Sequence, residues 1–373
     1  MRVLHIITTL GEGGAQGVLT RICCYDNPSI SHYIISLKQA DTHSEKLISN
    51  NCSVLKLGIG EGFWQTIHSF FKLYKLINQI NPDVIQTWMY YGDFFGGLAA
   101  WLAAKKNIIW SVRHCSIDHN TKIKTRLVIK ILSYMSYFVP KKIIFNSRKS
   151  SLEHIKYGYS QKKIIVIPNG FETTSFEKLS DKCYEFRNSL GISENQKLIG
   201  MVARYHPDKD HKTLLLTIKQ VKNYFPKIIC LLVGENIDYN NYNLTSLINH
   251  LNLEENVKLL GVRRDISMIM KCLDIHLLTS SSEAFPNVIG EAMANGVPCI
   301  STNVGDASFL IGKTGWILNV GDVNSLSLRT IEALNASDDP LWKERKFEAF
   351  KRIEECFSID KMISSFLKVW CNP

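Results

Sequence analysis

Short apolar runs alternate with longer amphipathic segments along most of the 373-residue chain. The runs are rich in Ile and Val and are bounded by Gly, Pro, Asn or charged residues, which is typical of buried strands. The longer segments, such as residues 66–80 and 211–225, repeat their apolar residues at helical spacing. Strand and helix in alternation predict parallel sheets that are covered by helices on both faces.

The predicted strands fall into two series. The first is RVLHIITTL (2–10), HYIISLK (32–38), SVLKLGI (53–59), DVIQTWM (83–89), NIIWSVR (107–113), KKIIFNS (141–147) and KIIVIPN (163–169). The second is KLIGMVA (197–203), IICLLVG (228–234), NVKLLGV (256–262), DIHLLTS (274–280), PCISTNV (298–304) and GWILNV (315–320).

The turn cluster Pro168-Asn169-Gly170 ends the first series and suits a linker. We therefore expect an α/β fold of two doubly wound domains, residues 1–168 and 169–355, followed by an amphipathic terminal helix within residues 356–373 that crosses back to the N-terminal domain. In such folds ligands bind beyond the carboxyl ends of the strands, so we expect a site in a cleft between the domains.

Composition narrows the class of protein. No stretch reaches 18 uncharged apolar residues, so no membrane-spanning helix is expected. The N-terminal apolar run fits a first strand better than a signal peptide. The ten cysteines are scattered without a CxxC pair, which predicts reduced thiols in a cytoplasm rather than disulfides or a zinc site.

The net charge of +10 is unevenly distributed. Residues 1–168 hold 21 Lys and Arg against 9 Asp and Glu, whereas the remainder is slightly acidic. The first half is thus expected to face something anionic: a membrane surface, a phosphorylated acceptor or nucleic acid. No nucleic-acid-binding motif accompanies the charge, so we expect no nucleic acid partner.

The stretch TKIKTRLVIKIL (121–132) places Lys122, Arg126 and Lys130 on one face of a predicted helix. Apolar residues lie next to these cations, and a basic amphipathic face can dock on anionic lipid. Our hypothesis is peripheral contact with the inner face of the cytoplasmic membrane. The alternative is a solvated outer face of a doubly wound domain.

The first strand leads into TLGEGGAQGVLTRI, where Gly13 and Gly14 precede a helical pattern. A glycine-rich loop at a helix start lets backbone N–H groups approach a phosphate. The dinucleotide fingerprint G-x-G-x-x-G fails because Gln16 occupies the third glycine position, which disfavours a nicotinamide dehydrogenase. A plain tight turn remains the alternative.

Two further loops carry candidate groups. Arg204 and Lys209 follow the first strand of the second series and could neutralise a diphosphate. Asp208 and Asp210 form a D-x-D string beside them, for which a turn or a helix cap is favoured over a metal site. His114 follows a strand and could reach a cleft, although a structural role stays open.

The stretch EAFPNVIGEAMANG (283–296) combines two carboxylates with a helix start. Pro286 and Asn287 are favourable at a helix start, which places Glu283 in the preceding loop and Glu291 about one turn into the helix. Backbone donors for phosphates would lie between two carboxylates that can accept hydrogen bonds from sugar hydroxyls. Purely structural roles for both glutamates are an equal alternative.

With these motifs in order, nearly the full chain resembles the retaining glycosyltransferases of family 4, which have the two-domain GT-B fold. The E-x7-E motif from Glu283 to Glu291 is the most specific element, and the GGA loop, the IPNG linker and the G-x-x-x-R-x-x-x-x-K loop occur in the expected order. The resemblance implies that Glu291 binds the ribose and that Glu283 contacts the donor sugar.

Further roles are implied by the same resemblance. Arg204 and Lys209 would stabilise the leaving diphosphate, and His114 would lie beside the transferred sugar. Backbone groups would bind sugar, phosphates and base at Phe285, Pro286, Asn287 and Val288, at Gly13 and Gly14, and in the base-binding loop from Gly261 to Asp265. Ala284 replaces a usual glycine, and Gln86 and Thr87 in DVIQTWM depart from the family pattern on the acceptor side.

The implied reaction moves a sugar from a UDP- or GDP-linked donor to a glycan or lipid-linked acceptor without a metal ion or other cofactor. A lipid-diphosphate-linked acceptor in cell-surface polysaccharide or lipopolysaccharide-type synthesis would suit the basic first half. Alternatives are a catalytically silent sugar-nucleotide-binding subunit, which the intact motif disfavours, and a sugar-nucleotide epimerase of the same fold, for which no first-domain carboxylate is evident.

Overall fold

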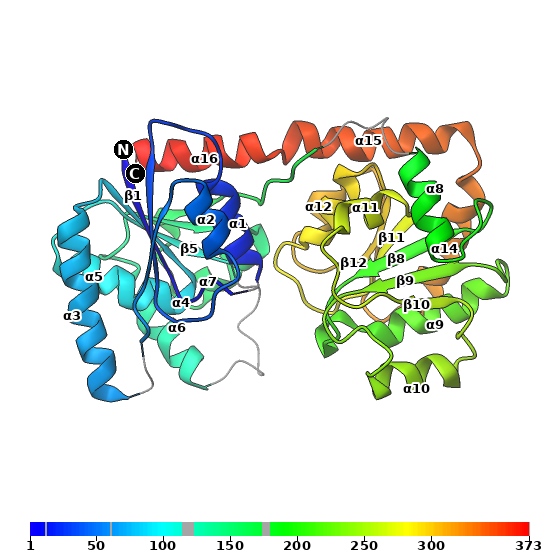
Figure 1. The fold of residues 1–373 in the computed structure, drawn as a ribbon, viewed down its shortest axis with the longest axis horizontal. Helices are drawn as coiled ribbons and strands as arrows, with labels where there is room; N and C mark the ends of the chain where they lie inside the picture. The colour runs from blue at the N-terminus through cyan, green and yellow to red at the C-terminus, as the bar shows by residue number, and fades with distance from the viewer. Residues whose placement is uncertain (12, 60–61, 114–122, 174–179, 373) are drawn as a thin grey trace. The chain divides into compact units, whose positions relative to one another are not determined.

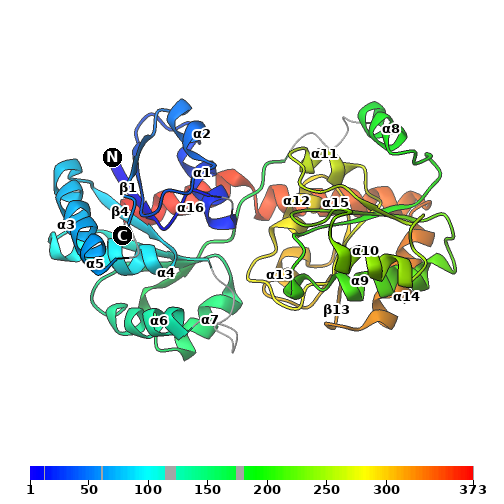
Figure 2. The ribbon, with the colours of Figure 1, turned by 60° about the horizontal axis from the view of Figure 1, so that its bottom comes forward.

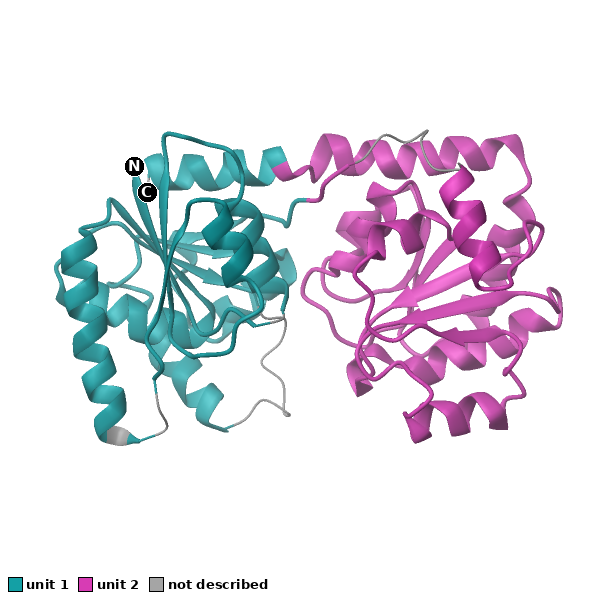
Figure 3. Cartoon of the chain, viewed as in Figure 1, with its two compact units in different colours: residues 1–170, 360–373 teal, residues 171–359 magenta. Residues whose placement is uncertain are grey.

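All thirteen predicted strands form, and they make two parallel sheets in the computed structural model of the chain (Figure 1). The structure describes residues 1–11, 13–59, 62–113, 123–173 and 180–372. The chain divides into two compact units, coloured separately in Figure 3: unit 1 comprises residues 1–170 and 360–373, and unit 2 comprises residues 171–359. Each unit has its own sheet and core, so the fold is α/β with two Rossmann-like domains.

Unit 1 contains a seven-stranded sheet with the order β3-β2-β1-β4-β5-β6-β7. The strands are β1 (Arg2–Ile7), β2 (Ser31–Ser36), β3 (Ser53–Lys56), β4 (Val84–Trp88), β5 (Ile108–Val112), β6 (Lys142–Phe145) and β7 (Ile164–Val166). Every pairing is parallel. The strand order reverses between β1 and β4, and a doubly wound sheet binds ligands at such a switch point.

Helices cover both faces of this sheet, with α1, α2 and α16 on one side and α3, α5, α6 and α7 on the other (Figure 2). Their bounds are α1 (Gly14–Cys23), α2 (Ser44–Ser49), α3 (Phe63–Ile80), α4 (Met89–Tyr91), the π-helix η1 (Gly92–Gly96), α5 (Gly97–Leu102), α6 (Ile123–Met135), α7 (Arg148–Lys156), the short 3₁₀ turn η2 (Gln161–Lys163) and α16 (Ile359–Cys371). The central strands β4 and β5 are buried along their whole length, as expected for strands of a parallel sheet that is covered on both faces.

Unit 2 contains a six-stranded parallel sheet with the order β10-β9-β8-β11-β12-β13. The strands are β8 (Leu198–Val202), β9 (Ile229–Val233), β10 (Val257–Leu259), β11 (Ile275–Leu278), β12 (Cys299–Thr302) and β13 (Trp316–Leu318). The helices are α8 (Ser180–Ser189), the 3₁₀ turn η3 (Pro207–Lys209), α9 (His211–Lys222), α10 (Tyr242–His250), α11 (Ile266–Lys271), α12 (Asn287–Ala294), α13 (Ala307–Ile311), α14 (Val323–Ala336) and α15 (Pro340–Cys356). In this sheet the order reverses between β8 and β11.

The C-terminal helix α16 belongs to unit 1 from residue 360 onward, although the sequence places it after unit 2. Its Trp370 is buried, and the indole Nε1 donates a hydrogen bond of 2.9 Å to Oε1 of Gln86 on β4. Gln86 and the neighbouring Thr87 are wholly buried. Both residues therefore belong to the core of unit 1, because β4 lies at the centre of a sheet that is covered on both faces.

Candidate active site

The candidate residues of unit 2 gather where the β8 and β11 strands end, at the switch point of the sheet. Arg204 and Lys209 lie in the connection from β8 to α9, and Glu283 lies in the connection from β11 to α12. Parallel strands bring their carboxyl ends to one edge, so two loops that are about 75 residues apart in sequence become neighbours.

Lys209 and Glu283 form an ion pair at this edge. The ammonium Nζ lies 2.5 Å from Oε1 of Glu283, and the side chains are 22% and 14% exposed, respectively. The hydroxyl of Ser280 donates a second hydrogen bond, of 2.8 Å, to the same carboxylate oxygen. Two donors on one oxygen fix the carboxylate in place.

The backbones of the two loops are also joined. The N–H of Ser281 donates to the carbonyl of Asp208 at 2.8 Å, and the hydroxyl of Thr279 donates to the carbonyl of Asp210 at 3.0 Å. The Asp210 carboxylate caps α9 by accepting from the N–H and the hydroxyl of Thr213. The D-x-D string is accordingly engaged in a helix cap, as favoured from the sequence.

Arg204 is exposed at the same edge, and its side chain has no ion pair or hydrogen bond within the described part of the chain. Its backbone is held by the neighbours, because Ala203 N–H donates to Val233 and Tyr205 N–H donates to Glu235. Gly234 permits this approach, since a Cβ there would lie 2.3 Å from the carbonyl oxygen of Ala203. A rigid backbone thus presents a guanidinium that is available to an anionic ligand.

The helix α12 starts at Asn287, with Pro286 as its N-cap residue in an extended conformation. The ring of Phe285 is buried and stacks on Phe171 at a centroid distance of 6.2 Å. The first N–H groups of a helix, here those of Asn287 and Val288, are not used by the helix ladder itself, and the helix dipole favours an anion in front of them. The start of α12 is therefore oriented for phosphate binding.

The second carboxylate, Glu291, lies within α12 and is half-buried. The preceding Gly290 is a close-contact position, because a Cβ there would lie 2.1 Å from the ring of Phe171. Asn295 holds the other end of the helix by donating 2.8 Å to the carbonyl of Glu291. The sequence showed the E-x7-E spacing but gave no indication of the aromatic packing that positions α12.

The loop that carries Glu283 is braced from behind by the residues after β12. The N–H of Asp306 donates to the carbonyl of Ala284 at 2.9 Å. Gly305 has a φ of +52°, and a Cβ there would lie 2.2 Å from the same carbonyl oxygen. This position requires glycine for two independent reasons, and sequence reasoning did not identify it.

The predicted base-binding loop follows β10, at the same edge of the unit 2 sheet. Gly261 has a φ of +64° and donates its N–H to the carbonyl of Ile237 at 2.8 Å. Asp265 accepts two hydrogen bonds from Arg263, of 2.8 and 2.6 Å, and this pairing lowers the pKa of Asp265. The side chain of Asp265 is thus occupied by Arg263, while the Gly261 backbone turns the chain.

In unit 1, Gly13 and Gly14 lie at the start of α1 as expected, and both are exposed. The side chain of Gln16 lies over Gly13, where a Cβ would meet its Oε1 at 2.4 Å, and its Nε2 donates to the carbonyl of Thr9 at 3.2 Å. Gln16 therefore ties the loop to the end of β1. His114 lies outside the described residues.

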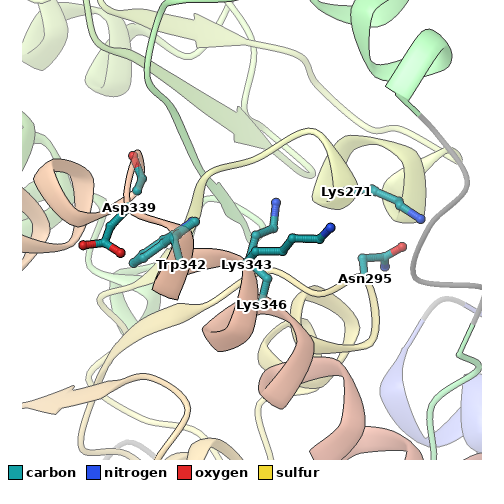
Figure 4. Close-up of a pocket in the computed structure, with 7 residues that line it drawn as sticks. Lys271, Asn295, Asp339, Trp342, Lys343 and Lys346 are labelled. Carbon is teal, nitrogen blue, oxygen red and sulfur yellow. The ribbon is translucent and has the colours of Figure 1, made fainter.

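A pocket of about 550 Å³ lies elsewhere in unit 2 and is shown in Figure 4. Its lining comes from the ends of α11 and α12 and from the beginning of α15, and includes Lys271, Asn295, Trp342, Lys343 and Lys346. These helix ends lead toward the amino ends of the strands. The pocket is therefore separate from the edge that carries the ion pair between the two loops.

The exposed face of α6 differs from the predicted one. Ile123, Leu127 and Tyr134 are 85%, 62% and 64% exposed, and the ammonium of Lys130 lies 5.1 Å from the centroid of the Tyr134 ring. Arg126 is half-buried, and Lys122 lies outside the described residues. The surface is thus apolar and aromatic with a flanking cation. Among the described residues, no helix is long and apolar enough to cross a membrane.

The chain thus has two Rossmann-like domains, and one of them pairs a cationic loop with a carboxylate loop at its switch point. Comparison with known proteins identifies the family. Residues 30–175 match the family model described as "Glycosyltransferase Family 4", and residues 184–347 match "Glycosyl transferases group 1". The chain belongs to these group 1, family 4 glycosyltransferases.

Several relatives cover most of the chain. A "UDP-Gal:alpha-D-GlcNAc-diphosphoundecaprenol alpha-1,3-galactosyltransferase" of Escherichia coli is 27% identical over 82% of this chain and 79% of its own length. A "Capsular polysaccharide biosynthesis glycosyltransferase CapM" of Staphylococcus aureus is 23% identical over 81% and 82%. The crystal structure of Anabaena HepE in complex with UDP superposes with a TM-score of 0.86 at 21% identity, over all of both chains. The fold is accordingly GT-B.

Proposed function

We propose that the chain is a retaining glycosyltransferase that moves a sugar from a UDP- or GDP-linked donor to a lipid-linked glycan acceptor. The observation that carries this proposal is the arrangement around Lys209 and Glu283, with Arg204 and the start of α12 on the same edge. Cations and helix N–H groups there lie where negative charge grows on a leaving diphosphate, and such preorganised stabilisation is the largest kind of catalytic contribution.

Each group has a role in this proposal. Arg204 and Lys209 bind the diphosphate, and Glu283 accepts hydrogen bonds from the donor sugar. Glu291 binds the ribose, and the loop from Gly261 to Asp265 binds the base. The leaving diphosphate takes the proton of the acceptor hydroxyl on the same face of the sugar, so the anomeric configuration is retained without a metal ion.

The remaining assigned residues complete the site. The backbone groups from Phe285 to Val288 bind the sugar and the phosphates. Gly13 and Gly14 approach the phosphates from unit 1, and His114 lies beside the transferred sugar. Residues 1–168 form the acceptor-binding domain and residues 169–355 the donor-binding domain in this proposal, with the helix of residues 356–373 completing the former.

A thermal-shift panel of UDP- and GDP-sugars tests the donor, because the preferred compound raises the melting temperature by mass action. The stereochemistry follows from the NMR coupling constant of the product, and the same reaction run with and without a chelator tests metal independence. A product of inverted anomeric configuration contradicts the retaining mechanism. Loss of activity in the presence of the chelator contradicts metal independence. Failure of every sugar nucleotide to bind contradicts the whole.

We also propose peripheral attachment to an anionic membrane surface through α6, where a lipid-linked acceptor would be found. The relative from Escherichia coli is named for a GlcNAc-diphosphoundecaprenol substrate and the relative from Staphylococcus aureus for capsular polysaccharide biosynthesis, which supports such an acceptor. Exposed aromatic and aliphatic side chains beside lysines suit the interface between headgroups and acyl chains. Sedimentation with anionic liposomes at low and high salt tests the attachment, and absence of binding at low salt contradicts it.

A further inference from the structure

The carboxyl edge of the unit 1 sheet contains a second cationic group that the proposed function has not used. Arg113 directly follows β5, and Asn146 directly follows β6. The register pairs Val112 with Phe145, so the next residues, Arg113 and Asn146, lie side by side on neighbouring strands. Both side chains therefore leave the sheet at the same edge, next to the switch point between β1 and β4.

In the part of the chain that the structure describes, the guanidinium of Arg113 is held by neutral groups. Its Nε donates 3.2 Å to the hydroxyl of Ser111, and its Nη1 donates to Oδ1 of Asn169. Its central carbon lies 5.2 Å from the ring centroid of Trp88 and 5.6 Å from that of Phe366. The planar cation is thus fixed in one orientation by two aromatic rings and two hydrogen bonds.

Within the described part of the chain, no carboxylate pairs with this cation. Among the described residues Arg113 has no ion pair, and its buried Nη2 has no hydrogen-bond partner. Burial and the nearby charge of Arg21 lower the pKa of Arg113 to about 9. A desolvated cation with an unused donor is unfavourable on its own, and an anionic ligand would remove both penalties.

Within the described ranges, the side-chain amide of the neighbouring Asn146 has an acceptor without a donor. Asn146 is 4% exposed, and its Oδ1 has no hydrogen-bond partner among the described residues. A guanidinium N–H without an acceptor and an amide oxygen without a donor therefore lie on adjacent strand ends. A phosphate oxygen satisfies the first, and a sugar hydroxyl satisfies the second.

We propose that Arg113 binds the diphosphate of the acceptor and that Asn146 accepts a hydrogen bond from a hydroxyl of the sugar attached to it. This inference rests on the proposed transfer to a lipid-diphosphate-linked acceptor and names the residues of unit 1 that recognise it. It assigns to the acceptor side a cation that is distinct from Arg204 and Lys209 on the donor side. The fork geometry of arginine is suited to two phosphate oxygens, whereas lysine provides only a point charge.

The test is titration of decyl diphosphate into the full chain by calorimetry, with UDP present at saturation to occupy the donor site. Arg113→Gln is expected to weaken the binding of decyl diphosphate about tenfold or more, because a charge-assisted contact is lost. Arg2→Gln is the matched control, since Arg2 lies at the opposite edge of the same sheet and donates to the carbonyl of Ile80. The uncharged decyl glucoside is expected to bind wild type and Arg113→Gln equally.

Two results overturn the proposal: equal affinity of wild type and Arg113→Gln for decyl diphosphate, or equal affinity of the wild-type chain for decyl diphosphate and decyl glucoside. If Arg113→Gln does not fold, Arg113→Lys is used instead. This variant keeps the charge but loses the fork of two donors, so it must still weaken the binding of decyl diphosphate. Unchanged affinity of Arg113→Lys rejects the role of Arg113. The titration with UDP alone reports separately on the proposed function. Loss of UDP binding would contradict the donor site and leave the comparison of the decyl compounds interpretable.

Discussion

Replacing Lys209 by Met removes one partner of the ion pair and keeps much of the apolar volume of the side chain. Glu283, which is 14% exposed, would keep the 2.8 Å hydrogen bond from Ser280 and lose the ammonium. Removing the ammonium partner of a largely buried carboxylate costs about 1–3 kcal/mol. The melting temperature should then fall by about 2–4 °C per kcal/mol for a domain of this size.

The effect on catalysis should be larger than the effect on stability. Loss of one preorganised donor to the leaving diphosphate lowers turnover by about 10²-fold or more. The assay is release of nucleoside diphosphate in the presence of acceptor, measured below the melting temperature of the variant. The same loss is expected for Arg204→Ala, and without the stability change, because the Arg204 side chain is exposed and makes no described contact.

Lys197→Met is the matched control for Lys209→Met. Lys197 also forms a lysine–carboxylate pair, with Asp338 at 2.6 Å, but it directly precedes β8 and so lies at the amino edge of the same sheet. The substitution Lys197→Met should therefore leave turnover unchanged. Normal turnover in both Lys209→Met and Arg204→Ala would refute the assigned roles, and a loss in Lys197→Met would show that the effect is not specific to the site.

Three further substitutions test two closely packed glycines of unit 2 and a buried carboxyl group of unit 1. Gly290→Ala places a Cβ 2.1 Å from the ring of Phe171 and should destabilise the fold by about 1–3 kcal/mol in chemical denaturation. Gly17→Ala is the control, because a Cβ at this helical position would meet nothing within 4 Å and should not destabilise the fold. Equal denaturation midpoints for the two variants would contradict the packing argument. Gly305→Ala should lower turnover by displacing the loop of Glu283. Gly321→Ala is the control, because its φ of +74° gives the same kind of backbone strain but a Cβ there would meet nothing within 4 Å. Equal turnover in the two variants would show that Gly305 does not hold the loop of Glu283 in place. Burial raises the pKa of Asp93 well above its usual range, so the folded chain binds this proton more tightly than the unfolded chain and loses stability as the pH rises from about 4 toward that raised pKa. Asp93→Asn should therefore stabilise the protein more at pH 7 than at pH 4, and a pH-independent difference would reject this explanation.

The strands were predictable because the parallel sheets bury them on both faces, and a continuous apolar run bounded by turn residues is a local property. The start of α12 was likewise readable from Pro286 and Asn287. The contact between Lys209 and Glu283 was not, because the sequence assigns one residue to the diphosphate and the other to the sugar, and only the β8–β11 pairing brings the two loops together.

Glycines that are required by close packing show no pattern in the sequence around them. Gly290 and Gly305 matter because of Phe171 and Ala284, which come from other parts of the fold. Gln86 and Thr87 were singled out only as departures from the family pattern on the acceptor side, and nothing local indicated their partners in the core. In the structure Oε1 of Gln86 accepts a hydrogen bond from Trp370 of α16, and the Thr87 hydroxyl donates to Asp93.

A crystal structure of the chain with bound UDP or GDP tests the central claim most directly. The account predicts diphosphate oxygens within hydrogen-bonding distance of Arg204 and Lys209, in front of the start of α12, and ribose hydroxyls against Glu291. Nucleotide seated instead among Lys271, Lys343 and Lys346, in the pocket at the other edge of the sheet, would contradict it.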